Sequence, residues 1–247
     1  YCIITLDVGI ALGFCIDSTG IHPTDDKLLA IKNAPEPSNV TQLQSYLGML
    51  NFYRRFVKNI SSLLEPLNKL LRKDSKCIWS PEQEKAFEAS KTALLNSEAL
   101  IHFDPKLPIV VTADSSSYGL GAVLAHVIDG HERPVCFVSR TLNTAERNYS
   151  QIEREALSLV FALKKFHYYL YGQRFTLVTD HKPLLSIFSS TKTIPNMASG
   201  RIQRWCLMLQ AYHFSIVHKS GTKMGTADAL SRLPLHNSNE SVPVPTA

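Results

Sequence analysis

The fold of this chain is decided by Ile109-Val110-Val111-Thr112-Ala113-Asp114. An apolar run of this length, rich in β-branched residues, predicts a buried strand. The run ends on a single carboxylate. A carboxylate at the end of a strand projects into the crevice beyond the sheet, where ligands of open α/β sheets bind. Asp114 is therefore the first candidate for a functional residue.

Three further acids have local settings of the same kind. Asp180 follows a second apolar run, residues 175–179, while Glu155 lies in the first turns of a long amphipathic helix pattern, and Asp228 lies in a short predicted helix near the C-terminus. Four converging carboxylates repel one another unless cations lie between them. Hard oxygen ligands without a thiolate suit Mg²⁺ or Mn²⁺.

From about Ile101 onward, the apolar pattern has the period of strands, interrupted by helical stretches. The links between the first three strands are short, which predicts an antiparallel meander. The predicted order is β-β-β-α-β-α-β-α, which is typical of a mixed α/β (α+β) sheet flanked by helices. The predicted strands are 109–113, 119–125, 135–139, 175–179 and 214–217, and the predicted helices are 156–170, 199–209 and 226–233.

The chain before Ile101 has a different pattern. Residues 1–22 read as two strands or a hairpin from the edge of a larger upstream domain, and residues 23–100 as a small helical subdomain. Ser80-Pro81 is a helix start with proline at the first helical position. Residues 101–234 then form the sheet domain, and the polar residues 235–247 form a disordered tail.

Composition limits the class of protein. The chain has 247 residues, 45% of them hydrophobic, so it can bury a sizeable core. Its formal charge of +5 permits a polyanionic partner without requiring one. Five scattered cysteines without a C-x-x-C pair indicate reduced thiols in an intracellular protein, cytoplasmic or nuclear. The sequence has no secretory signal and no predicted membrane span.

Each acid taken alone has an ordinary interpretation. An Asp at a strand end is usually a turn residue, and a Glu on an amphipathic helix is usually solvated. Glu153 competes with Glu155, since both lie in one helical turn. The joint pattern instead suits a two-metal phosphodiesterase, in which Asp114 bridges both ions, Glu155 and Asp180 complete one shell, and Asp228 completes the other.

The motifs around these acids resemble the RNase H domain of Gypsy-type retrotransposon Pol polyproteins. The resemblance covers about residues 12–234 and implies an RNase H-like fold. It implies Asp114, Glu155, Asp180 and Asp228 as metal ligands for two Mg²⁺ or Mn²⁺ ions, with Glu155 preferred to Glu153 because it precedes the apolar stripe 156–163. The implied reaction is endonucleolytic hydrolysis of the RNA strand of RNA–DNA hybrids. The matching motifs are residues 112–124, 139–142, 145–157, 179–184, 201–205 and 227–232.

The helical part, through residues 20–23 and 46–56, resembles the thumb and connection that follow a polymerase palm. The chain departs from the family at residues 11–14, and the polymerase signature Y-x-D-D is absent. The resemblance therefore implies a reverse transcriptase fragment that does not polymerise DNA by itself. Its implied partners are RNA–DNA hybrids and the rest of the Pol polyprotein, meaning the polymerase palm and the integrase.

Several basic residues are candidates for contacts to nucleic-acid phosphates. A solvated basic face explains each of them equally well. Two other functions stay open. One is a captured, non-catalytic nucleic-acid-binding or interaction module. The other is an integrase or transposase, although the DNA-binding flanks that both of these enzymes need are missing. The candidates are Arg201 and Arg204 beside Trp205, Lys164 and Lys165 late in the long helix, and Arg54 and Arg55 in the helical subdomain.

Overall fold

The structure is a computed structural model that describes residues 9–11, 13–72, 78–188 and 200–220. Asp228, the predicted helix 226–233 and the predicted tail 235–247 lie outside the described residues.

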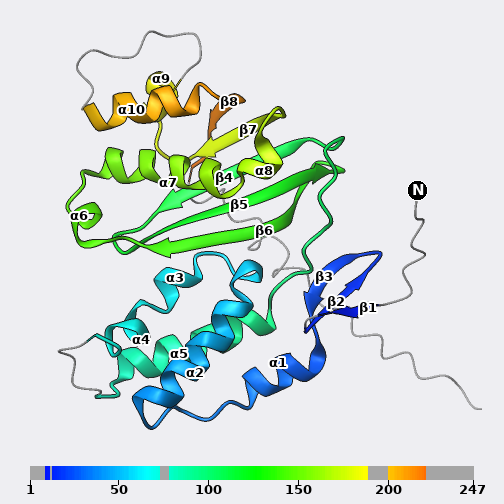
Figure 1. Cartoon of the computed structure of the whole chain (residues 1–247), viewed down its shortest axis with the longest axis vertical. Coiled ribbons are helices and arrows are strands. Elements are labelled where there is room, and N and C mark those ends of the chain that lie inside the picture. The colour runs from blue at the N-terminus through cyan, green and yellow to red at the C-terminus, as the bar shows by residue number, and fades with distance from the viewer. Residues whose placement is uncertain (1–8, 12, 73–77, 189–199, 221–247) are drawn as a thin grey trace, which may run out of the picture.

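A five-stranded mixed sheet forms the centre of the C-terminal half (Figure 1). Its strand order is β6-β5-β4-β7-β8. Strands β4, β5 and β6 form an antiparallel meander, whereas β7 pairs in parallel with β4 and β8 in parallel with β7. The predicted fold class is confirmed. The strands are β4 (Ile109–Ser115), β5 (Gly119–Ile128), β6 (His131–Thr141), β7 (Arg174–Thr179) and β8 (His213–His218).

The long helix α7 (Gln151–Lys165) packs against β4 and β5 and carries α10 (Gly200–Leu209) on its side. Ser150 and Glu153 form a capping box that fixes where α7 begins. Leu159 and Leu163 of α7 meet Val111 and Leu124 of the sheet in a core whose side chains are almost fully buried. The short helices of this half are α6 (Thr144–Arg147), α8 (His167–Leu170) and α9 (Pro183–Ile187).

The N-terminal edge has three strands rather than the predicted two: β1 (Gly9–Ala11), β2 (Phe14–Asp17) and β3 (Gly20–Pro23). The third strand was missed because part of its support comes from far along the chain. Ile21 exchanges two backbone hydrogen bonds with Leu100, at 2.7 and 2.9 Å. A local sequence pattern contains no signal for such a bridge.

The helices that follow enclose a second core, built from residues such as Leu43, Leu50, Phe87 and Leu94. Their starts follow the local chemistry of the sequence, because Asn39 accepts from the backbone of Gln42 and Ser80 forms a capping box. The helices are α1 (Asp25–Lys32), α2 (Val40–Phe52), the 3₁₀ helix η1 (Arg54–Phe56), α3 (Ile60–Leu63), α4 (Glu65–Lys69) and α5 (Pro81–Leu95).

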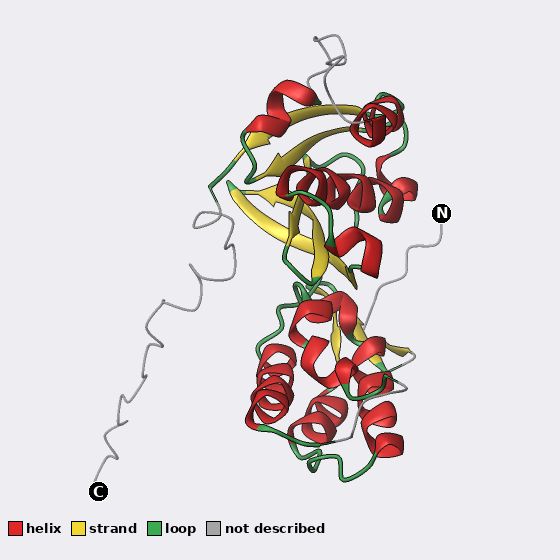
Figure 2. Cartoon of the chain, turned by 90° about the vertical axis from the view of Figure 1, so that its left-hand side faces the viewer, coloured by secondary structure: helices red, strands yellow, loops and turns green. Residues whose placement is uncertain are grey.

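The helical subdomain lies against the sheet on the face opposite α7 (Figures 1 and 2). Helix η1 contacts β6, and α3 contacts both β5 and β6. Strand β6 shows the alternation that this requires, because Val138 packs into the cores beneath α7, whereas its neighbours Phe137 and Ser139 meet the helical subdomain. The sheet is thus the middle layer of three.

Two other observations concern the predicted thiols and the membrane. Cys136 and Cys206 are free and buried, and Cys15 is free and partly exposed; Cys2 and Cys77 lie outside the described residues. Within the described ranges, no helix combines the length and the apolarity that a membrane crossing needs.

Candidate metal centre at the ends of strands β4 and β7

Asp114 and Asp180 are brought together by the register of two parallel strands. Val111 lies beside Leu177 and Thr112 beside Val178. Asp114 lies two residues after Thr112 in β4, and Asp180 lies two residues after Val178, directly after the end of β7. Since residues at equal positions of parallel neighbours project to the same face, the two carboxylates leave the sheet together.

Glu155 reaches the same place from α7. Its side chain is nearly buried, with the residue 4% exposed. Its Oε1 accepts a hydrogen bond of 2.7 Å from Ser115 Oγ, and Ser115 directly follows Asp114 in β4. The strand that carries the first acid therefore also orients the second.

Carboxylate oxygens of Asp114, Glu155 and Asp180 all lie within 4.8 Å of one another. Glu155 Oε2 is buried, and no described protein group hydrogen-bonds to it. A buried acceptor without a partner is costly, and a cation between the acids would satisfy it. The three hard oxygen donors fit Mg²⁺ or Mn²⁺.

The electrostatics of the group agree with this fit. Burial, together with repulsion from Asp180 and Asp114, raises the pKa of Glu155 to about 7, although the Ser115 hydroxyl opposes the shift. Burial and the charge of Asp180 likewise raise the pKa of Asp114, against a lowering by Lys58. Without a cation, the proton equilibria of Glu155 and Asp114 are therefore shifted toward their protonated forms.

Glu153, the competitor of Glu155, has a different position. Its Oε2 accepts from Ser150 at the start of α7, and its Oε1 accepts from Arg201 Nη1 at 2.6 Å. The structure thus groups Glu155, and not Glu153, with the two aspartates.

Sequence reasoning missed the approach of the helical subdomain to this site. Asn59 has a left-handed backbone with φ of 51°. Its side chain lies over Gly121, where an added Cβ would stand 1.5 Å from Asn59 Oδ1. Gly121 pairs with Asp114 across β4 and β5, and the positive charge of Lys58 lowers the pKa of Asp114. A signal was available, since glycines inside a strand often mark a close backbone approach.

The basic candidates on α10 and α7 do not gather at the acids as one group. Arg201 is bound to Glu153 and lies 3.9 Å from the centre of the Tyr149 ring, whereas Arg204 is exposed. Lys164 and Lys165 are exposed at the C-terminal end of α7. Lys164 lies nine positions after Glu155, which is about 14 Å of helix rise.

The two remaining candidates lie at the junction of the helical subdomain and the sheet. Arg54 Nη2 donates to the backbone oxygen of Ser139 at 3.0 Å. Arg55 is partly buried and acts electrostatically on the Cys136 thiol of β6. Contacts of all six basic residues with nucleic acid stay predictions.

The C-terminal half matches a known family. Residues 104–212 match the model described as "RNase H-like domain found in reverse transcriptase". The chain is 34% identical over 231 residues to the retrovirus-related Pol polyprotein from transposon 297 of Drosophila melanogaster, an alignment that covers 93% of this chain and 21% of that protein. It is 32% identical over 237 residues to the transposon Tf2-3 polyprotein of Schizosaccharomyces pombe, covering 95% and 17%. The chain thus spans about a fifth of the length of such relatives.

Solved structures have the same fold. A foamy viral protease-reverse transcriptase in complex with RNA/DNA hybrid superposes with a TM-score of 0.69 at 23% identity, covering 97% of this chain and 31% of that one. A complex of the foamy viral enzyme with double-stranded DNA gives a TM-score of 0.70 at 23% identity, covering 86% and 38%. At this identity the likeness concerns the fold alone.

Fold and family model together define the class of residues 104–212: an RNase H-like domain of the reverse-transcriptase type. The chain that carries this domain is related to the Pol polyproteins of Gypsy-type retrotransposons, so the resemblance found in the sequence is confirmed.

Proposed function

We propose that this chain is the ribonuclease H part of a retrotransposon reverse transcriptase, and that it hydrolyses the RNA strand of RNA–DNA hybrids. The observation that carries the proposal is the convergence of Asp114, Glu155 and Asp180, with ligand atoms within 4.8 Å of one another, inside a domain of the RNase H-like family.

Two Mg²⁺ or Mn²⁺ ions are the proposed cofactors. Asp114, Glu155 and Asp180 would hold them, together with Asp228, which lies outside the described residues. When bound, such ions activate a water molecule and stabilise the attacking and leaving oxygens of a phosphodiester. The uniform set of carboxylate oxygens and the unpartnered Oε2 of Glu155 support this choice.

The protein's own contribution is positional. Strands β4 and β7 hold two acids at fixed spacing, and Ser115 limits the rotamers of Glu155 through its hydrogen bond. Elements packed in this way keep ligands oriented before substrate arrives, which lowers the cost of reorganisation during the reaction.

The proposed substrate is a hybrid duplex recognised by 2′-hydroxyls and groove shape, not by base sequence. The RNA/DNA hybrid bound by a foamy viral relative of similar fold supports this choice. The proposed division of the chain is a palm edge (1–22), a thumb and connection (23–100), the RNase H domain (101–234) and a tail (235–247). The polymerase palm and the integrase are proposed partners, because the relatives are longer polyproteins.

One experiment tests the function. The purified chain is incubated with a hybrid labelled on its RNA strand or on its DNA strand, in the presence of Mg²⁺, Mn²⁺ or EDTA. We expect internal cleavage of the RNA strand with Mg²⁺, and no cleavage of either strand with EDTA. Tight binding of the hybrid without cleavage in either Mg²⁺ or Mn²⁺ would instead favour the captured, non-catalytic module.

A further inference from the structure

A cavity of about 620 Å³ lies where the helical subdomain meets the end of β6. Its volume is within the range of sites for small organic ligands. It shares no residue with the group formed by Asp114, Glu155 and Asp180. Gly48 of α2 also lines it. Its charged lining consists of four arginines and one carboxylate, which are Arg54, Arg72, Arg140, Arg147 and Glu65.

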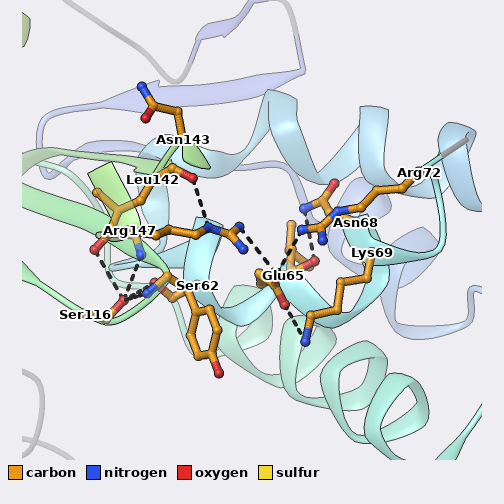
Figure 3. A network of polar contacts seen from close by, with 12 residues as sticks. Ser62, Glu65, Asn68, Lys69, Arg72, Ser116, Leu142, Asn143 and Arg147 are labelled. Atoms are coloured by element: carbon orange, nitrogen blue, oxygen red, sulfur yellow. Dashed lines mark hydrogen bonds and ion pairs between the residues drawn. The ribbon is translucent and has the colours of Figure 1, made fainter. Parts of the chain in front are cut away.

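The single carboxylate is outnumbered by the cations around it. Glu65 is nearly buried and receives Lys69 Nζ at 2.9 Å, Arg72 Nη2 at 3.2 Å and Arg147 Nη2 at 3.7 Å (Figure 3). Lys69 also pairs with Glu82, at 3.6 Å, so Glu65 is left to balance Arg72 and Arg147, and one negative charge cannot neutralise two positive ones. Its effect is to hold Arg72 and Arg147 on the cavity wall, so that little side-chain entropy is lost when they bind a ligand.

Of the other two arginines, Arg140 is paired with a carboxylate and Arg54 donates to uncharged oxygens. Arg140 forms a two-pronged ion pair with Glu146, with N–O distances of 2.6 and 2.8 Å. Arg54 donates to Asn51 Oδ1 and to the backbone oxygen of Ser139, which are both uncharged acceptors. Arg54 therefore adds a held positive charge to those of Arg72 and Arg147.

The cavity also has room and an apolar surface. Leu47 and Leu64 line it and are otherwise buried. A Cβ added at Gly48 would meet nothing within 4 Å. A guanidinium fork matches the geometry of phosphate oxygens, and leucine side chains suit the flat face of a base.

We propose that this junction cavity binds the phosphate group of a nucleotide. The phosphate belongs either to a free mononucleotide or to one unit of a nucleic-acid strand, and in the second case the inference rests on the proposed function. Arg54, Arg72 and Arg147 are the proposed phosphate ligands.

Gly48 offers a matched pair of variants. Gly48→Glu brings a negative charge to the cavity, and Gly48→Gln brings the same shape without charge. Both replace a helical glycine, so both are expected to fold at least as stably as the wild type. Binding to the full chain is measured in EDTA, so that no cleavage takes place, with three probes: inorganic phosphate, adenosine 5′-monophosphate and an RNA–DNA hybrid.

We expect at least one probe to bind Gly48→Glu about tenfold or more weakly than Gly48→Gln, because a carboxylate among the arginines repels phosphate. We expect Arg147→Gln to weaken the same probe, and Arg174→Gln, which removes an exposed charge at the start of β7, to leave the binding of mononucleotide or inorganic phosphate unchanged. A difference with the mononucleotide or with inorganic phosphate identifies a free ligand. A difference with the hybrid alone identifies a strand phosphate.

Equal binding of all three probes by the two Gly48 variants overturns the inference, and so does the failure of every probe to bind. These outcomes are separate from those of the nuclease assay. A chain that fails to cleave hybrids in Mg²⁺ yet discriminates the Gly48 pair with a free probe would contradict the proposed function and leave this inference intact.

Discussion

At the scale of single residues, the site depends on acids that the fold keeps close together and partly buried. Glu155 is the clearest case, because burial raises its pKa to about 7 while Ser115 fixes its orientation. The sequence identified Asp114, Glu155 and Asp180 as candidates, because two of them end apolar strands and one begins an amphipathic helix. It could not choose between Glu153 and Glu155 from spacing alone, since that choice depends on which face of α7 meets β4.

The raised pKa of Glu155 predicts a specific pH dependence of stability without metal. Between pH of about 4.5 and about 7, the unfolded chain loses the Glu155 proton and the folded chain keeps it. The unfolded state binds fewer protons there, so the free energy of unfolding falls as pH rises, by roughly 3 kcal/mol at most. Urea unfolding in EDTA at pH 5 and 7.5 measures the fall, and Glu155→Gln should reduce it. Mg²⁺ should restore stability at pH 7.5, because it binds the charged acids. A flat profile for the wild type would contradict the burial of Glu155.

The two glutamates of α7 should differ in their effect on cleavage. Their side chains leave the helix about 200° apart, so only one of them faces the acids. We expect Glu155→Gln to lower the rate of hybrid cleavage by about 100-fold or more. This is a larger loss than the removal of a group that only orients a metal ligand typically causes. Glu153→Gln should keep most of the activity and lose the ion pair with Arg201, at a cost of up to about 1 kcal/mol. Equal losses in both variants would mean that this helical register is wrong.

At the scale of elements, the unexpected feature is the packing of α3 against the five-stranded sheet. Ser61 contacts Ser139, with 2.9 Å between the hydroxyl oxygens, and Ser62 contacts Ser116 at 3.0 Å. Ser116 also accepts from the backbone of the β4–β5 turn, which follows Asp114. The sequence predicted strands and helices from local periodicity, and it predicted the start of α5 from Ser80. It did not predict this docking, because the contacting residues lie 54 to 78 positions apart.

A double-mutant cycle tests the docking at Gly121. The Cβ of Gly121→Ala would collide with the Asn59 side chain, at an expected cost of about 1–3 kcal/mol in the free energy of unfolding. Asn59→Gly removes the colliding atoms and suits the left-handed backbone at that position. Gly121→Ala should therefore cost much less in the Asn59→Gly background, as measured by urea unfolding of all four chains. Additive effects would show that Asn59 does not lie over Gly121 in solution.

At the scale of the whole molecule, hydrophobic cores lie on both faces of one sheet layer. Leu100 belongs to the core of the helical subdomain, and Ile101 packs against the core of the sheet domain. The sequence indicated a change here, because the apolar period shifts near Ile101. The sharing of β6 between both halves was not predictable, since it depends on the opposite faces that Val138 and Ser139 present to different partners.

The segment 101–234 should fold alone but bind hybrid more weakly than the full chain. Removal of residues 1–100 exposes Phe137 and takes away Arg54 and Arg72 at the junction. With fewer phosphates neutralised by the protein, affinity should fall less steeply with salt, and the log–log slope should be shallower by about 0.9 for each such phosphate. Anisotropy titrations of both chains at several salt concentrations give the slopes. Identical slopes would exclude the helical subdomain from substrate binding.

The central claim is that Asp114, Glu155 and Asp180 form a catalytic metal centre. It is tested most directly by measuring Mg²⁺-dependent cleavage of the RNA strand by three chains: the wild type, Asp114→Asn and the control Asp129→Asn. The control removes an exposed acid in the β5–β6 turn, at a left-handed position that asparagine tolerates. We predict that Asp114→Asn loses cleavage by more than about 100-fold. It should still bind hybrid. In EDTA it should unfold at the wild-type temperature or above, because repulsion from Asp180 is relieved in the metal-free site. Asp129→Asn should cleave like the wild type. Cleavage by Asp114→Asn at the wild-type rate would contradict the assignment of the three carboxylates as the catalytic metal centre.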